Sequence, residues 1–332
     1  MHGRVDLQKY GASCKTLKNF ICFPHGGIVK RSGTRFVAEC KDSANTKRLI
    51  PFVFSTTQAY ILEFGNDYIR FYRNEGQILD SGSAYEISSP WGEEYLDGLS
   101  FTQSADILYV THPEFKPRKV TRTGHTTWTV AEFDQTDGPY LDQNTSATTM
   151  TPSHASGSSR TITASVSTFA STDVGRLIRL KHSSTWGYAK VTGFTSATVV
   201  TVTILSDFGG TGSTTDWRLG AWSDTTGWPT CVTFYQDRLF FANTTNQPNT
   251  VYSSKSGDFE NFAPTATDGA VTDDSALVFT LATSQVNAIR WMSGARQLQL
   301  GTSDGPFLMS SGSDNLALTP TNVTVNRETS DG

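Results

Sequence analysis

Residues 227–262 read GWPTCVTFYQDRLFFANTTNQPNTVYSSKSGDFENF, and this stretch decides the fold class. The run from Val232 to Phe241 is rich in aromatic and β-branched residues, which favour strands. The turn formers of residues 243–249 follow it, and a second short strand is expected at residues 250–253. Because aromatic rings stand on both faces, this hairpin is expected to lie between other sheets.

Three other segments show the same order of strand, polar turn and returning strand. They are residues 59–72 with a turn at 65–67, residues 106–120 with a turn at 112–114, and residues 298–309 with a turn at 303–305. One hairpin cannot bury its apolar face alone, so several must stack. The sequence predicts an all-β, propeller-like stack of short antiparallel sheets. The uneven spacing of the hairpins leaves a β-sandwich as the alternative.

The composition of the chain changes at residues 141–160, where LDQNTSATTMTPSHASGSSR contains few large apolar residues and predicts a linker. Residues 161–219 are then expected to form a small inserted β module, with a strong strand at residues 198–205 (TVVTVTIL). Residues 1–140 and 220–332 would form the two parts of one hub.

The charge balance of the 332 residues argues against a nucleic-acid-binding surface. The formal net charge is −4, and charged residues make up 17% of the chain, below the globular average of about 25%. A mildly acidic surface along which DNA slides remains compatible with these values. There is no apolar leader at the start and no run of 18 apolar residues, so we expect cytoplasmic folding without membrane insertion.

No metal or cofactor site is expected. Cys14, Cys22, Cys40 and Cys231 form no C-x-x-C pair, so free thiols are predicted rather than a zinc site. The aspartates at 268, 273 and 274 lack the spacing of a calcium loop. Similarly, Gly26–Gly27 predicts a turn rather than a phosphate loop, and the basic residues 30, 31 and 35 predict a solvated rim.

The sequence contains no recognisable catalytic motif, so no catalytic residue is assigned and no enzymatic activity is expected. The adjacent pair Glu93–Glu94 points in two directions and predicts a solvated face. A carboxylate pair for sugar cleavage, assembled from distant residues, remains open. The six histidines fall in expected turns or polar stretches, namely His2, His25, His112, His125, His154 and His182.

Several segments resemble the tail nozzle family of short-tailed bacteriophages, also called tail tubular protein B. The segments that carry this resemblance cover much of the chain outside residues 140–216: GRVDLQKY (3–10), HGG (25–27), RSGTRFV (31–37), LGAWS (219–223), GWP (227–229), FYQDRLFFA (234–242), SSKSGDF (253–259), NF (261–262) and LTPTNV (318–323). Residues 161–219 are similar to the small barrel-like insertion called FCCH-like.

This resemblance implies a structural virion protein of the phage tail. It implies a β-propeller hub that assembles into a hexameric ring, forms part of the DNA ejection channel, and contacts the tail adaptor and the tail fibres or spikes. Genomic DNA would pass without sequence specificity. Because family members are usually longer, the resemblance also implies a truncated propeller, and it supplies no catalytic residue.

A second hypothesis is a carbohydrate-binding or carbohydrate-degrading tail protein. The rings of Trp186, Tyr188, Trp217 and Trp222 can stack on sugars if they are exposed. We favour the interpretation that they belong to the core.

Overall fold

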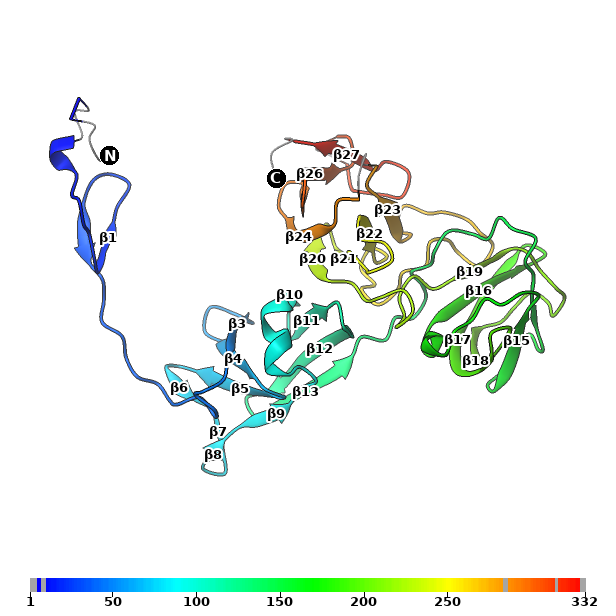
Figure 1. The fold of residues 1–332 in the computed structure, drawn as a ribbon, viewed down its shortest axis with the longest axis horizontal. Coiled ribbons are helices and arrows are strands. Elements are labelled where there is room, and N and C mark those ends of the chain that lie inside the picture. Colours follow the sequence, from blue (N-terminus) through cyan, green and yellow to red (C-terminus); the bar gives the residue numbers. More distant parts are fainter. Residues whose placement is uncertain (1–4, 7–9, 283–285, 314–315, 329–332) are drawn as a thin grey trace. The chain divides into compact units, whose positions relative to one another are not determined.

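The computed structural model describes residues 5–6, 10–282, 286–313 and 316–328, and its regular structure is almost entirely β-strand (Figure 1). The chain divides into two compact units, residues 1–40 and residues 41–332, called here the N-terminal segment and the main body. Most of the segment 3–10 and the chain end at 329–332 lie outside the described residues. None of the described helices is long and apolar enough to cross a membrane.

The N-terminal segment is built around one isolated hairpin. Its elements are the 3-10 helix η1 (Tyr10–Ala12) and the strands β1 (Phe20–Cys22) and β2 (Ile28–Lys30). The two strands pair with each other only, with Ile21 opposite Val29. The amide of Phe23 donates to the carbonyl of Gly27 at 2.8 Å, which closes the turn.

Four antiparallel sheets follow one another along the main body, which confirms the predicted all-β stack. The second, third and fourth are meanders of strands that are neighbours in sequence, whereas in the first residues 86–88 pair with residues 68–70. The predicted hairpins at 59–72, 106–120 and 298–309 all form. The first sheet contains β3 (Arg48–Val53), β4 (Ala59–Gly65), β5 (Tyr68–Arg73), β6 (Gly76–Gln77) and β9 (Glu86–Ser88), beside the small hairpin β7 (Leu79–Asp80) and β8 (Ser83–Ala84). The second follows η2 (Glu93–Gly98) and contains β10 (Ser100–Ser104), β11 (Ile107–His112), β12 (Phe115–Gly124) and β13 (Thr127–Glu132). The third contains β20 (Cys231–Tyr235), β21 (Arg238–Ala242), β22 (Thr250–Ser253) and β23 (Leu277–Thr280), and the fourth β24 (Ile289–Gly294), β25 (Leu298–Thr302), β26 (Gly305–Ser310) and β27 (Thr324–Arg327).

The apolar run at residues 232–241 contains two strands, so the prediction of a single strand there was wrong. Gln236 and Asp237 have φ values of 45° and 57°, and β20 and β21 pair on either side of them. Two consecutive positive φ angles make the tight turn that a two-residue hairpin needs. The sequence concealed this turn because neither position is a glycine or an asparagine, the residues that usually mark it.

Buried side chains explain why the sheets stack. Along β21, Leu239 and Phe241 enter the core shared with the second sheet, whereas Phe240 and Ala242 enter the core shared with the fourth. Successive strand residues point to opposite faces, so a sheet buried on both faces needs an unbroken apolar run. A third core lies between the first and second sheets, where Trp128 packs on Phe52 with ring centroids 4.8 Å apart.

The inserted module is a curled antiparallel sheet with its own core. Its strands, in spatial order, are β14 (Met150–Pro152), β15 (Arg160–Ala164), β18 (Val199–Ser206), β17 (Thr185–Ser196), β16 (Leu177–His182) and β19 (Trp217–Leu219), with η3 (Ser171–Asp173) between β15 and β16. Hydrogen bonds of 2.9 and 3.0 Å between the backbones of Met150 and Thr214 join the β14 edge to the segment before β19.

The structure places part of this module inside the predicted linker 141–160. Strand β14 lies there, and Met150 is completely buried. The amides of Leu141 and Asn144 donate to the carbonyls of Leu219 and Trp217. Composition suggested a linker because Ser and Thr dominate the segment, but backbone pairing and one buried methionine order it.

Candidate functional site

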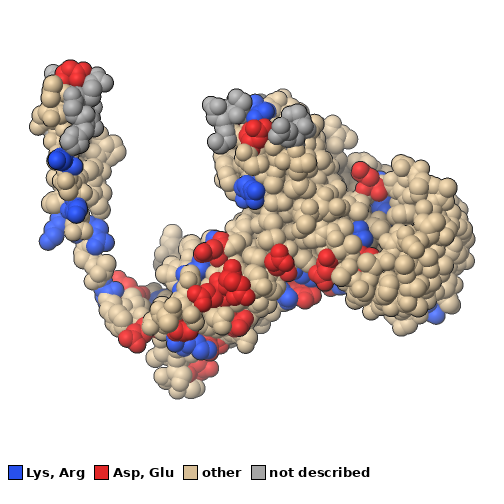
Figure 2. All heavy atoms as spheres, viewed as in Figure 1, with Lys and Arg blue, Asp and Glu red and all other residues tan. Residues whose placement is uncertain are grey.

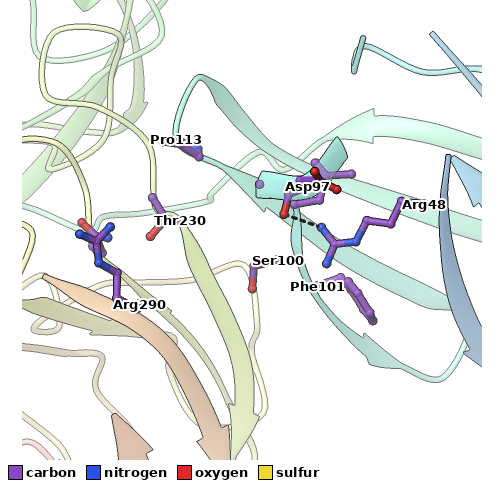
Figure 3. A pocket seen from close by; sticks show the side chains of 10 residues that line it. Arg48, Asp97, Ser100, Phe101, Pro113, Thr230 and Arg290 are labelled. Carbon is purple, nitrogen blue, oxygen red and sulfur yellow. Dashed lines mark hydrogen bonds between the residues drawn. The ribbon is translucent and has the colours of Figure 1, made fainter. Parts of the chain in front are cut away.

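A pocket of about 470 Å³ lies where the first strands of the four sheets approach one another. Figure 3 shows Arg48 reaching toward Asp97 on one side, with Thr230 and Arg290 on the other. These residues come from the starts of β3 and β24, from η2 and from the residue before β20. Each of the four sheets contributes to the lining a residue of its first strand or the residue just before that strand, and this pocket is called here the axial pocket.

Two guanidinium groups, those of Arg48 and Arg290, and the carboxylate of Asp97 set the electrostatics of this axial pocket. Arg48 Nη1 donates to the carbonyls of Leu96 and Asp97 at 2.7 and 3.1 Å. Burial lowers the pKa of Arg48, and the nearby Asp97 charge opposes that effect. Arg290 is exposed. The pocket therefore offers hydrogen-bond donors and acceptors and charges of both signs, because the carboxylate of Asp97 and the hydroxyl of Ser100 also line it.

A second, larger groove of about 760 Å³ runs along β23, the last strand of the third sheet. Its lining also includes Arg218, beside β16 in the inserted module, and Val323, before β27. The Nε atom of Arg218 is buried and has no hydrogen-bond partner among the described residues. Burial, followed by the nearby charge of Arg179, lowers the pKa of Arg218.

The aromatic residues considered for sugar stacking are partly or completely covered. Trp222 is 1% exposed and belongs to the core between the second and third sheets, and Trp186 is 6% exposed. The guanidinium carbon of Arg179 lies 5.1 Å from the centroid of the Trp186 ring. Tyr188 and Trp217 are half-buried, and Trp217 packs against the core of the inserted module.

The carboxylates considered from sequence serve the local fold. Glu93 accepts a hydrogen bond from the amide of Thr46, which lies far from it in sequence. Asp268 accepts from the amide of Ala270 at 2.9 Å, and Asp274 pairs with Lys255 at 2.9 Å. In the described part of the chain, no three His, Cys, Asp or Glu side chains come together in a way that could hold a metal ion.

Two histidines lie in strands rather than in the turns expected for them. His112 ends β11 and is buried, and its Nδ1 accepts from the amide of Glu114 at 3.1 Å. Burial lowers the pKa of His112, with Glu114 opposing. His182 ends β16, with its Nε2 2.7 Å from the carbonyl of Gly212. By contrast, His125 lies on an exposed turn, where it contacts Arg73.

Sequence reasoning missed a buried polar cluster between the inserted module and the hub. Tyr140 donates to the carboxylate of Asp137, and Arg179 Nη2 donates to the carbonyls of Thr265 and Ala266. Burial raises the pKa of Asp137, and Arg179 opposes that shift. An arginine in the apolar stretch LIRL (177–180) was the available signal, because an arginine there must find buried acceptors.

No protein-family model matches the chain, and no curated protein matches it.

Proposed function

We propose that the chain is a structural component of a phage tail, a nozzle-like hub that works by packing against other protein surfaces along the DNA path. The observation that carries this proposal is the set of exposed apolar side chains on the outer face of the first sheet. On the first sheet Leu49, Val53 and Ile61 point away from the buried residues Ile50 and Phe52 and are 63%, 57% and 41% exposed.

The fourth sheet, at the other end of the stack, exposes one large apolar side chain. Trp291 is 49% exposed and lies over Gly301, where an added Cβ would stand 2.0 Å from the ring. No described sheet packs on either end face. Exposed apolar faces of this kind mark surfaces that other proteins cover, and neighbouring subunits of a closed ring supply such covers.

The assignment as a nozzle protein rests on the sequence resemblance in addition to these exposed apolar side chains. In that proposal the ring is hexameric, lies below the tail adaptor, contacts fibres or spikes and lines part of the DNA channel. The axial pocket and the groove along β23 are then surfaces for protein partners. The covered state of Trp186 and Trp222 gives the carbohydrate hypothesis no specific support.

Immunogold electron microscopy on particles of the phage whose genome encodes this chain tests the proposal. An antibody against the chain is expected to label the tail tip, coaxial with the portal. Label on lateral spikes, or particles without label, would overturn it. A polysaccharide-cleavage assay on the purified chain is expected to show no turnover.

A further inference from the structure

The N-terminal segment has many apolar side chains but no core in which to bury them. Of its described side chains in residues 10–40, only Ala38 is even partly buried. The exposed ones include the large apolar residues Phe20, Ile21, Phe23, Ile28, Val29, Phe36 and Val37. An isolated two-stranded hairpin is marginally stable in water, so this segment needs a surface to cover it.

Both faces of the hairpin carry apolar side chains, and Lys30 shares one face with Phe20. The register places Phe20 and Ile28 on one face and Ile21 and Val29 on the other, because paired residues share a face and successive residues alternate. A hairpin that covers the edge of a single body needs one apolar face only. Two apolar faces fit a position between two protein surfaces.

The charge of the N-terminal segment indicates which kind of surface it binds. Residues 1–40 contain seven Lys and Arg residues and two Asp and Glu residues, which gives a net charge of +5. Residues 41–332 contain the remaining 20 Lys and Arg residues and 29 Asp and Glu residues, which gives a net charge of −9. Figure 2 shows Lys and Arg along the N-terminal segment and Asp and Glu in greater number on the main body. Opposite charges of this size steer association and stabilise it at low salt.

We infer that the N-terminal segment is an assembly arm that binds the acidic main body of a second copy of the chain. Nucleic acid is also a polyanion, but aliphatic side chains such as Ile21, Ile28 and Val29 gain little from a phosphate backbone and much from an apolar protein face. The inference rests on the self-assembly in the proposed function and specifies which part of each subunit reaches its neighbour.

A cross-linking experiment distinguishes contacts between two copies of the chain from contacts within one copy. Cys22 is exposed in β1, whereas Cys231 is buried, so the variant Cys14→Ser/Cys40→Ser can be labelled at Cys22 with a benzophenone. Labelled chain with natural isotopes is mixed with unlabelled ¹⁵N chain, irradiated, and analysed by mass spectrometry. Cross-links from Cys22 to ¹⁵N peptides of residues 41–332 are expected. Cross-links confined to the labelled chain itself, or none at all, would overturn the inference.

Matched variants separate apolar contact from charge. Ile21→Asp and Ser32→Asp each add one negative charge to the exposed segment, but only the first removes an apolar side chain. Sedimentation velocity of the full chain is expected to show association at least roughly tenfold weaker for Ile21→Asp than for Ser32→Asp. Raising the salt concentration should weaken both. Equal association of the two variants would contradict the inference. Binding of DNA by the full chain without any self-association would contradict it as well.

The outcomes also separate this inference from the nozzle proposal. Label at the tail tip together with cross-links only within one copy would refute the arm and leave the nozzle assignment standing. Cross-links between copies together with label away from the tail tip would support the arm and refute the nozzle assignment.

Discussion

The guanidinium of Arg238 donates to the carbonyl of Ser275 at 2.7 Å and thereby ties the start of β21 to the loop before β23. Arg238 is 2% exposed, and it also donates to the carbonyls of Ser254 and Asp273 at 2.9 and 2.6 Å. One buried cation therefore satisfies backbone acceptors from two segments that are far from it in sequence.

Replacing this cation is expected to destabilise the third sheet. Arg238→Met keeps most of the side-chain length but leaves several buried carbonyls without a donor, at a cost of about 3 kcal/mol in the free energy of unfolding. Urea denaturation followed by tryptophan fluorescence measures the change. The control Arg290→Met removes an exposed arginine and should change stability by less than about 0.5 kcal/mol. Equal effects would show that the hydrogen bonds of Arg238 contribute nothing specific.

A buried ion pair inside the inserted module accepts a hydrogen bond from the hub. Asp173 and Arg176 are 1% and 4% exposed and lie 2.9 Å apart, and Thr225 Oγ1 donates to the same carboxylate oxygen at 2.7 Å. Asp173→Ala leaves the Arg176 charge buried without its partner, so we expect a loss of about 3–5 kcal/mol.

A double-mutant cycle tests the link across the junction. Thr225→Val alone should cost about 1 kcal/mol, and the two changes together should cost less than their sum, because they remove the same contact. Strict additivity would mean that the Thr225 hydroxyl does not interact with Asp173.

Acid stability should depend on Asp274. Hydrogen bonds from Thr272 and then from Lys255 lower the pKa of its carboxyl from 3.8 to about 2. The unfolded chain therefore takes up the proton first as the pH falls. The contribution of Asp274 to stability is complete above about pH 4 and is lost as the pH falls toward 2. Unfolding curves across this range for the chain and for Asp274→Asn measure it.

The control for this titration is Asp268→Asn, which removes a carboxylate from the same loop without touching the Lys255 pair. Only Asp274→Asn should reduce the pH dependence of the free energy of unfolding between about pH 4 and pH 2. A carboxyl ¹³C titration of Asp274 with its midpoint near 3.8 would contradict the expectation.

The four thiols should fall into two reactivity classes. Cys14, Cys22 and Cys40 are exposed, whereas burial raises the pKa of Cys231 to about 11. Because the thiolate is the nucleophile, iodoacetamide at pH 8 is expected to modify three cysteines of the native chain, and Cys231 only after unfolding. Mass spectrometry counts the adducts. Modification of Cys231 at the rate of the others would show that the core between the third and fourth sheets opens readily.

Much of the fold could be predicted because it depends on the local pattern of apolar residues and turn formers. The hairpins at 59–72 and 298–309 have apolar runs on either side of turn formers, which indicates strand and turn without knowledge of the neighbours. The turn at Gln236–Asp237 and strand β14 were missed because their residues are atypical and only pairing with distant segments holds them. No site residue was predicted, and the axial pocket shows why: Arg48, Thr230 and Arg290 share no sequence pattern.

The sequence by itself determined the all-β class and the positions of the hairpins at 59–72, 106–120 and 298–309. These properties depend on composition and on period-two patterns, which local chemistry sets. Only the tertiary structure decided that Leu239 and Phe240 belong to two different cores, that Arg238 and Arg179 are buried donors, and that Leu49 and Trp291 stand on uncovered faces. Burial depends on which sheets meet, and residues far apart in the chain decide that together.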